Sequence, residues 1–336
     1  MNKKERIRAF AALGSYILDN SDDLQEIIHK SFTYNSWLTQ KNTQQALQHI
    51  ANSFLNEQAL ENWINHYVMP DETEPKTVAI VAAGNIPMVA FHDIFAVLIS
   101  GHRLQLKLSE KDRFLLPFIL QQLIRIAPAF KDYISIVERL ENFDAVIATG
   151  SNNSAQQFSF YFGKYKNIIR RNRNSIAILN GQESLEDLQN LGADIFNYFG
   201  LGCRNVSKIF IPKGYNLLQL KEGFMKYKEV DQHNQYMNNM DYQRTLCLMN
   251  QTPLVDIDFI NILENKSLHS PISCLHYEYY ENLQEIEAYI QEEQDNLQCI
   301  VGNCGLKGSI PFGKSQQPSL SDYADNVDTM DFLLAL

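Results

Sequence analysis

The chain has 336 residues, 45% of them hydrophobic, and a formal net charge of −10 at pH 7. This length is enough for one large or two ordinary domains with a sizeable core. The acidic balance argues against nucleic acid as a general partner, because phosphate binding needs a basic field, although a local basic pocket for a phosphorylated cofactor stays open.

The sequence also argues against secretion and membrane insertion. The N-terminal stretch MNKKERIRAF is charged, and no apolar signal-peptide segment follows it. No stretch approaches the ~18 uninterrupted apolar residues of a membrane-spanning helix. The five cysteines include no CxxC pair, which disfavours a disulfide framework or a zinc site. We therefore expect a cytoplasmic protein without a bound metal.

Residues 1–69 are predicted to be helical. The stretches DDLQEIIHKSF and TQQALQHIANSFL place apolar residues at three- and four-residue spacing, which is typical of amphipathic helices. Residues 69–76, MPDETEPK, are acidic and Pro-rich, so we expect a connector there.

Strands and helices alternate between residues 77 and 180. Pro87 suits the first turn of the helix after the first strand, and Gly101 suits its C-terminal stop. We expect the next helix to bend or to restart at Pro117, and another helix to start at Ser151. The predicted strands are 77–85, 102–109, 133–138, 144–150 and 174–179. This alternation predicts βαβ units and a parallel, Rossmann-like sheet, although no GxGxxG fingerprint is present.

Residues 183–202 predict one amphipathic helix and then a tight turn. Ser184 and Asp187 form a capping-box pattern, and Gly200 and Gly202 are expected to end the helix. Cys203 follows directly, just before the predicted strand VSKIFIP. A cysteine at such a chain reversal is either a small buried side chain or a nucleophile, and its placement alone favours the buried side chain.

The remaining residues, 213–336, are more polar and less regular. Residues 268–303 predict a strand, a helix and a strand, and residues 308–326 predict a Gly/Pro/Ser-rich loop. The C-terminal stretch TMDFLLAL is apolar, and it could form a strand that pairs with a neighbour.

Four stretches, in this order, resemble the aldehyde dehydrogenase superfamily. AAGNIPMVAF resembles its strand–turn–helix segment with an Asn-x-Pro turn, and GHRLQLKLSEKD resembles the segment whose Lys and Glu hold the adenosine ribose. DAVIATGSNNSAQ resembles the strand ending in Thr-Gly-Ser, and FNYFGLGCRNVSKIFIP resembles the segment with the catalytic cysteine. The late loop SIPFGKSQQPSLSDY extends the resemblance over roughly 76–325. Within the superfamily, the short chain is similar to the LuxC-like acyl-CoA reductases.

The resemblance implies a set of site residues. Cys203 would be the nucleophile that forms an acyl-enzyme, and Asn85 would donate to the oxyanion together with the Cys203 backbone N–H. Without the family context, Asn85 reads as a turn-forming residue. The residues implied to bind the cofactor are Gly84, Lys107, Ser109, Glu110, Thr149, Gly150 and Ser151. The Glu110 carboxylate favours NADH over NADPH, whereas the LuxC-like group implies NADPH, so both cofactors stay open.

Two departures from the superfamily pattern bear on the reaction. Ordinary aldehyde dehydrogenases carry a general-base Glu about where this chain has Arg170, and a second carboxylate near the place of Ser267. An enzyme that hydrolyses its acyl-thioester must activate water, whereas one that reduces a thioester must keep water away. The departures therefore imply a reductive, acylating enzyme. A carboxylate supplied by Glu183 or Glu186 would instead support an oxidative dehydrogenase.

The stretch KYKNIIRRNR is a basic run. Its charged members are Lys164, Lys166, Arg170, Arg171 and Arg173. They could receive the phosphates of CoA or NADPH, or they could form an ordinary solvated face.

Together these observations predict an aldehyde dehydrogenase-like α/β protein. It would have a helical segment at 1–75, an NAD(P)-binding Rossmann-like domain at 76–182 and a second α/β domain with the catalytic cysteine at 183–336. The predicted reaction is NAD(P)H-dependent reduction of an acyl-CoA, with a fatty acyl group favoured, to an aldehyde. The alternatives are an oxidative aldehyde dehydrogenase and a non-catalytic binding protein of the same fold. The resemblance also implies a homodimer or another homo-oligomer.

Overall fold

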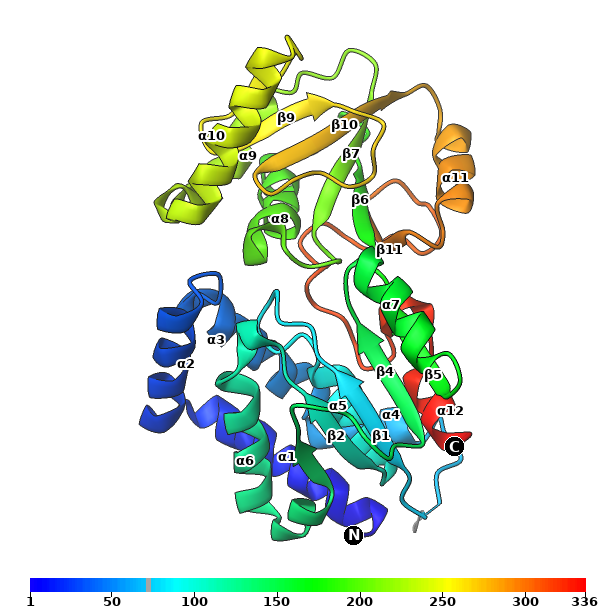
Figure 1. The fold of residues 1–336 in the computed structure, drawn as a ribbon. Coiled ribbons are helices and arrows are strands. Elements are labelled where there is room, and N and C mark those ends of the chain that lie inside the picture. The colour runs from blue at the N-terminus through cyan, green and yellow to red at the C-terminus, as the bar shows by residue number, and fades with distance from the viewer. Residues whose placement is uncertain (71–73) are drawn as a thin grey trace. The chain divides into compact units, whose positions relative to one another are not determined.

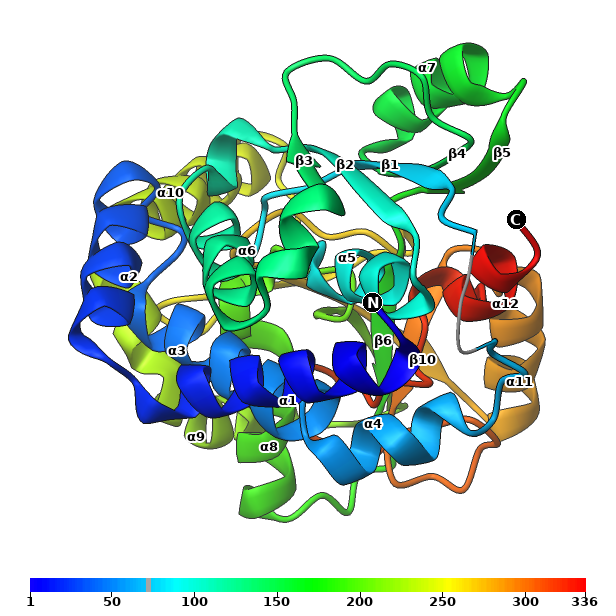
Figure 2. The same ribbon diagram turned by 90° about the horizontal axis from the view of Figure 1, so that it is seen from below.

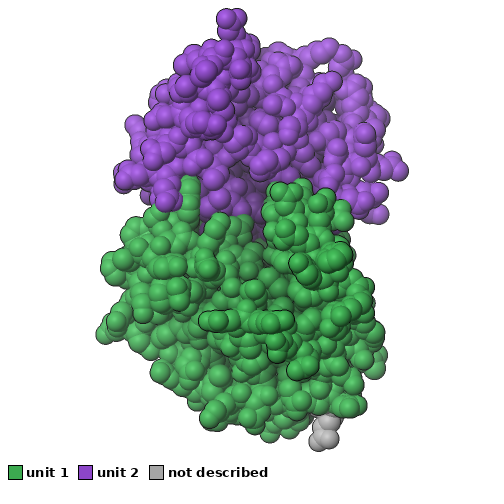
Figure 3. Space-filling model, in the orientation of Figure 1, with its two compact units in different colours: residues 1–172, 318–336 green, residues 173–317 purple. Residues whose placement is uncertain are grey.

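The computed structural model describes residues 1–70 and 74–336, and the chain divides into two units (Figure 3). Unit 1 comprises Met1–Asn172 and Pro318–Leu336, and unit 2 comprises Arg173–Gln317. The middle of the predicted connector 69–76 lies outside the described residues. Each unit is built on a sheet of its own.

Unit 1 contains a five-stranded sheet, here called sheet A, in which every strand pair is parallel (Figure 1). Its strands are β1 (Thr77–Val81), β2 (Arg103–Lys107), β3 (Ile134–Ile136), β4 (Ala145–Thr149) and β5 (Lys166–Arg170). The strand order is β3-β2-β1-β4-β5, so β1 has β2 on one side and β4 on the other. Open parallel sheets bind ligands at such a switch point, beyond the carboxyl ends of the strands.

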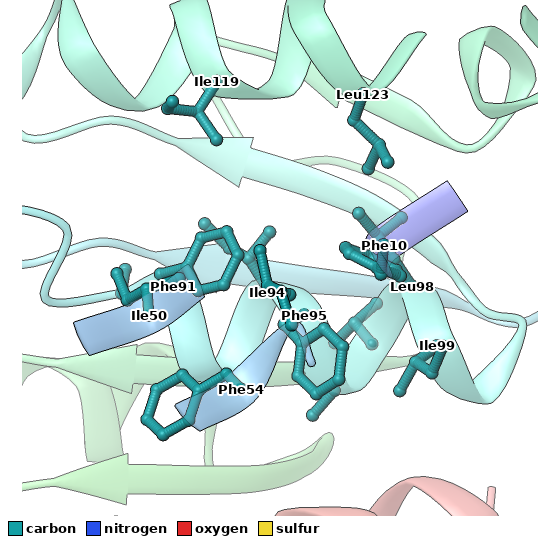
Figure 4. Close-up of a cluster of buried hydrophobic side chains, with 14 of the residues drawn as sticks. Phe10, Ile50, Phe54, Phe91, Ile94, Phe95, Leu98, Ile99, Ile119 and Leu123 are labelled. Carbon is teal, nitrogen blue, oxygen red and sulfur yellow. The ribbon is translucent and has the colours of Figure 1, made fainter. Parts of the chain in front are cut away.

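Helices cover sheet A and enclose most of the apolar core of unit 1. They are α1 (Lys3–Asp19), α2 (Asp22–Tyr34), α3 (Gln40–His49), α4 (Glu57–Ile64), α5 (Phe91–Ser100), α6 (Leu115–Ile126), α7 (Asn152–Phe162) and α12 (Thr329–Leu334). Shorter helical turns are η1 (Ile50–Phe54), η2 (Glu110–Asp112), η3 (Pro128–Asp132) and η6 (Ala324–Asn326). Helix α1 contacts α4, α5 and α6 (Figure 2). In the core, Phe10 of α1 meets Phe95 of α5 edge to face with ring centroids 4.8 Å apart, and the same buried cluster contains Phe54 and Leu123 (Figure 4).

Several local predictions for unit 1 need correction. The helix after β1 starts at Phe91 rather than Pro87, because Met88 has a left-handed backbone with φ of 57°. At Pro117 the structure has the predicted restart and not the bend: η2 ends at Asp112, and α6 begins at Leu115 with Pro117 in its first turn, where proline is tolerated. Strand β5 lies within the basic run and was not predicted. The stretch TMDFLLAL is not a strand but contains α12, which Asp328 caps by accepting from the Asp331 N–H.

Unit 2 contains a six-stranded sheet, here called sheet B, with the order β11-β6-β7-β10-β9-β8. Its strands are β6 (Asn174–Ile178), β7 (Val206–Pro212), β8 (Val255–Asp256), β9 (Asn261–Glu264), β10 (Cys274–Tyr280) and β11 (Leu297–Val301). Its helices are α8 (Leu185–Phe196), α9 (Gln219–Phe224), α10 (Asn234–Met249) and α11 (Leu283–Glu292), with shorter turns η4 (Asn197–Gly200) and η5 (Met225–Gln232). The pairs are parallel except for the antiparallel β8.

The strand predicted at 174–179 does not belong to the first sheet. As β6 it pairs with β7 and β11 in sheet B, so the change from unit 1 to unit 2 falls at residue 173, before this strand. Residues 318–336 return to unit 1, although the sequence placed them with the cysteine domain. Within the described ranges, no helix is both long and apolar enough to span a bilayer.

Candidate functional site

Cys203 lies in a β-turn between η4 and β7. The Gly202 carbonyl accepts from the Asn205 N–H at 3.0 Å, and the Gly202 N–H donates to Asn205 Oδ1 at 2.9 Å. Asn205 therefore closes the turn through both its backbone and its side chain. The thiol is half-buried and is not in a disulfide. The chain reversal that the sequence predicts at Cys203 is present.

Asn205 also ties this turn to the end of α8. Its buried Nδ2 donates to the carbonyls of Asp194 (3.1 Å), Ile195 (3.3 Å) and Asn197 (2.8 Å). Carbonyls at the end of a helix lack partners within the helix, so one side chain satisfies several of them. The sequence analysis missed Asn205, although an Asn just beyond a glycine-containing turn is a signal that could have indicated it.

The backbone just before the turn is strained. Helix α8 has the predicted Ser184–Asp187 capping box but ends at Phe196, not at Gly200 or Gly202. Tyr198 and Phe199 then have φ values of 54° and 58°, a conformation that bulky residues rarely adopt. Both side chains are buried, so packing holds the strained conformation in place.

The amino ends of the sheet B strands hold the other side of the turn. Ser175, fully buried in β6, donates to the Cys203 carbonyl at 2.9 Å and accepts from the Cys299 N–H at 3.1 Å. Arg204 donates to Cys299 Sγ at 3.3 Å. The residues around the thiol are thus bonded to β6 and β11, which gives the nucleophile candidate a preorganised frame.

The two carboxylates considered as hydrolytic bases lie at the opposite edge of sheet B from Cys203. Glu183 accepts from the backbone N–H groups of Asn180 and Gly181, beyond the carboxyl end of β6. Glu186 lies in the first turn of α8, whereas the cysteine turn follows the last, and a 12-residue helix spans about 18 Å. Neither side chain is placed to activate water at the Cys203 thioester.

Asp194 is the carboxylate nearest to the turn along α8, and it has a structural role. Its two oxygens accept from the backbone N–H groups of Gly313 (2.6 Å) and Ser315 (3.0 Å), and the side chain is fully buried. Burial raises the pKa of the Asp194 carboxyl, against the effect of these hydrogen bonds. Asp194 thus fixes the loop after β11 to α8.

Ser267, at the place of the second superfamily carboxylate, lies in the loop that connects β9 to β10. Its N–H donates to Asn265 Oδ1 at 2.8 Å, and its Oγ donates to the His269 carbonyl at 3.0 Å. Its side chain is therefore used to shape this loop.

In unit 1, the predicted cofactor residues come together at the carboxyl edge of sheet A. Gly84 follows β1, Lys107 ends β2 and Thr149 ends β4, so all three lie beyond or at the ends of neighbouring strands. A Cβ on Gly84 would lie 2.6 Å from Ser109 Oγ, so only glycine fits there. Asn85 is the next residue and is half-buried.

The two serines predicted at helix starts both act as caps. Ser109 accepts from the Lys111 N–H at 3.3 Å and precedes η2, which places Glu110 in the first, exposed position. Ser151 accepts from the Ser154 N–H at 3.3 Å and begins α7 as predicted. A Cβ on Gly150 would lie 2.7 Å from the Ser154 Cβ, which explains the glycine before this cap.

Asp112 is a buried carboxylate in unit 1 that the sequence analysis did not single out. The backbone N–H groups of Met88, Leu115 and Leu116 face its carboxylate, so Asp112 lies between the turn after Asn85 and the start of α6. Burial raises the pKa of Asp112 to about 6 in spite of these donors. Its position within the charged stretch EKDR gave no sign of burial.

Arg170, at the place expected for a general base, is a structural cation of unit 1. It is 3% exposed, and Nη2 donates to Asp93 Oδ1 at 2.7 Å and to Thr329 Oγ1 at 2.9 Å. Nη1 donates to the Ala324 carbonyl. The guanidinium therefore joins β5 to α5 and to the C-terminal segment that contains α12.

The basic run does not form one phosphate-binding face. Besides Arg170, Lys166 donates to the Ala335 carbonyl at 2.6 Å, within unit 1. Arg173 belongs to unit 2, where it donates to the Leu297 carbonyl at 3.1 Å. Lys164 and Arg171 are exposed. The five residues therefore do not act as one group: Arg170 is used within unit 1, and phosphate binding by the exposed members stays a prediction.

Arg170→Met should destabilise unit 1 by about 3–5 kcal/mol, because it leaves the buried Asp93 carboxylate without its cation. Both tryptophans of the chain, Trp37 and Trp63, lie in unit 1, so urea unfolding followed by tryptophan fluorescence reports on this unit. The exposed Arg171→Met is the matched control and should change stability by less than about 0.5 kcal/mol. Equal stabilities of the two variants would contradict the structural role.

Comparisons with known proteins agree with this architecture. A family model described as acyl-CoA reductase (LuxC) matches residues 14–232. No curated protein matches the chain. Among solved structures, aldehyde dehydrogenase 21 from Physcomitrella patens, in complex with succinate, is 13% identical with a TM-score of 0.73, over 100% of this chain and 84% of that one.

Two further solved structures share the fold, and both are cysteine-to-alanine mutants. Propionaldehyde dehydrogenase from Clostridium phytofermentans is 9% identical with a TM-score of 0.63, over 96% of this chain and 91% of that one. The indole-3-acetaldehyde dehydrogenase AldA of P. syringae, in complex with NAD+ and IAA, is 14% identical with a TM-score of 0.64, over 92% of this chain and 74% of that one. The predicted aldehyde dehydrogenase-like fold is thus confirmed.

Proposed function

Because this chain belongs to the LuxC family of acyl-CoA reductases, we propose that it reduces an acyl-CoA thioester to an aldehyde through an acyl-enzyme on Cys203. The observation that supports this most is the Cys203 turn. A half-buried thiol sits in a hydrogen-bonded frame, and both candidate carboxylate bases of unit 2 lie at the far edge of sheet B. Such a site suits acyl transfer to a thiol, and it places neither Glu183 nor Glu186 where it could act as the base for hydrolysis.

The proposed reaction has two halves. In the first, Cys203 Sγ attacks the thioester carbonyl, the bond to the CoA sulfur breaks, and CoA leaves as the thiol. The oxyanion that forms would be stabilised by the Asn85 side-chain amide and the Cys203 backbone N–H. In the second half, hydride adds to the acyl carbon and the bond to Sγ breaks, which releases the aldehyde.

A nicotinamide cofactor supplies that hydride, and the carboxyl edge of sheet A fits it. Thr149, Gly150 and the Ser151-capped start of α7 would face the pyrophosphate, since the backbone N–H groups at a helix start favour anions. Lys107 and the exposed Glu110 would contact the adenosine ribose. Glu110 favours NADH by repelling a 2′-phosphate, while the family resemblance favours NADPH, so we propose one of these two cofactors.

Two alternatives are tested by the same assay. An oxidative aldehyde dehydrogenase would need a base for water, and the placement of Glu183 and Glu186 speaks against it. A non-catalytic binding protein of this fold would neither react at Cys203 nor bind NAD(P)H.

The deciding experiment incubates the protein with acyl-CoAs of several chain lengths plus NADH or NADPH. We expect a loss of absorbance from the reduced cofactor, matched by trapped aldehyde and free CoA. Oxidation of an aldehyde to the free acid, with no reduction of any acyl-CoA, would favour the oxidative dehydrogenase. The absence of turnover, of cofactor binding and of a reactive Cys203 would favour the binding protein.

A further inference from the structure

The β9–β10 loop of unit 2, residues 265–273, crosses one face of sheet B and is held there by backbone contacts. The buried Lys208 donates from Nζ to the Lys266 carbonyl at 2.8 Å, and Ser207 donates from Oγ to the Leu268 carbonyl at 2.8 Å. Ser270 Oγ donates to the Cys274 carbonyl at 2.8 Å. The backbone on either side of residue 269 is therefore fixed to the sheet.

His269 projects from this loop with an exposed imidazole. Its Nδ1 lies 3.1 Å from Oδ1 of Asn174, the first residue of β6. An amide oxygen can only accept, so Nδ1 carries the proton and Nε2 of the neutral ring has its lone pair available. Among the described residues, Nε2 has no hydrogen-bond partner. This arrangement, a ring oriented through one nitrogen and open at the other, is that of a general base.

The imidazole is also on the same edge of sheet B as the thiol. Asn174 orients His269, and the adjacent Ser175 holds the Cys203 carbonyl at 2.9 Å. Two neighbouring residues at the start of β6 thus position the imidazole and the cysteine turn. The charged groups nearby are of both signs. Arg173 precedes Asn174 and Arg204 follows Cys203, whereas Lys208, under the loop, is paired with the Glu278 carboxylate at 2.7 Å.

The other two histidines of unit 2 do not meet these conditions. His233 caps α10, because its Nδ1 accepts from the Tyr236 N–H. The proton of the neutral ring is then on Nε2, so neither ring nitrogen has a free lone pair with which to act as a base. His276 is 5% exposed and lies within β10 in register with Lys208. Burial lowers the pKa of His276.

We propose that His269 is the general acid–base residue for thioester exchange at Cys203, an inference that rests on the proposed acyl-CoA reductase function. Nε2 takes the proton from Sγ as the Sγ–acyl bond forms. It then gives that proton to the CoA sulfur as the acyl–S bond to CoA breaks. The exchange is redox-neutral, leaves the imidazole in its starting form and runs in reverse when free CoA attacks the acyl-enzyme.

The test is His269→Ala, measured separately in the two halves of the reaction. Acyl-enzyme formation from acyl-CoA should slow by about 10²–10⁴-fold, the usual contribution of a general acid–base residue. Discharge of the acyl-enzyme by NAD(P)H should change by less than about tenfold, because hydride addition moves no proton to or from sulfur. Added imidazole should restore part of the acylation rate, which a loop that is merely distorted would not allow.

Lys266→Ala, an exposed change in the same loop, is the matched control and should acylate like the wild type. His269→Gln serves as a second variant in case His269→Ala unfolds. If neither His269 variant slows acylation, while the wild type forms an acyl-enzyme, the role of His269 is wrong and the proposed function stands. If the wild type forms no acyl-enzyme on Cys203, the proposed function fails first.

Discussion

Cys203→Ala should abolish acyl-CoA reduction and leave cofactor binding nearly intact. The thiol is proposed to form the covalent intermediate, whereas the residues proposed to bind the cofactor belong to unit 1. Mass spectrometry after incubation with acyl-CoA, in the absence of reductant, should show one acyl adduct on the wild type and none on the variant. Titration with NADH or NADPH, followed by fluorescence, should give similar affinities for both proteins.

Cys304→Ala is the matched control for this experiment. Cys304 is also a half-buried, reduced thiol of unit 2, but it lies in the loop after β11 and not in the cysteine turn. Its replacement should leave both the adduct and the reduction unchanged. An adduct that persists in Cys203→Ala, or that disappears in Cys304→Ala, would assign the nucleophile to another residue.

The regular elements could be predicted from the sequence because their signals are local. The apolar run at β1, the Ser184–Asp187 capping box and Gly101 as a helix stop each depend on a few neighbouring residues, and all are present. The four motifs also placed the proposed site residues at strand ends and at a chain reversal, as the structure has them. Local patterns of this kind are preserved when the chain folds.

Errors arose where distant contacts decide the outcome. Arg170 follows two isoleucines in a basic run, and nothing local shows that Asp93 and Thr329 bury it. Strand β6 is as rich in apolar residues as the strands of sheet A, so its composition could not show that it pairs in sheet B. The contact of Asn174 with His269 joins residues 95 positions apart and was not foreseeable from spacing.

The acyl-enzyme on Cys203 should react with hydride or CoA much faster than with water. The carboxylates proposed as alternative bases lie at the far edge of sheet B, and the buried Arg170 is bonded to Asp93. The proposed base His269 favours CoA over water as the attacking group. A thiol ionises with a pKa of about 8.5 and water with one of about 15.7, so an imidazole takes the proton of the CoA thiol far more readily. Acyl-CoA without reductant should therefore give a persistent acyl-enzyme and little free acid.

Single-turnover partitioning of a labelled acyl group measures this directly. Addition of NAD(P)H should discharge the label to aldehyde, and addition of free CoA should return it to acyl-CoA. Arg170→Glu is unsuited to restoring hydrolysis, because it would place a second carboxylate beside the buried Asp93 and disrupt unit 1 before it could act on water. Acid formation by the wild type that outpaces aldehyde formation at saturating cofactor would overturn the reductase proposal, since it would show that water reaches the acyl-enzyme on Cys203 faster than hydride does.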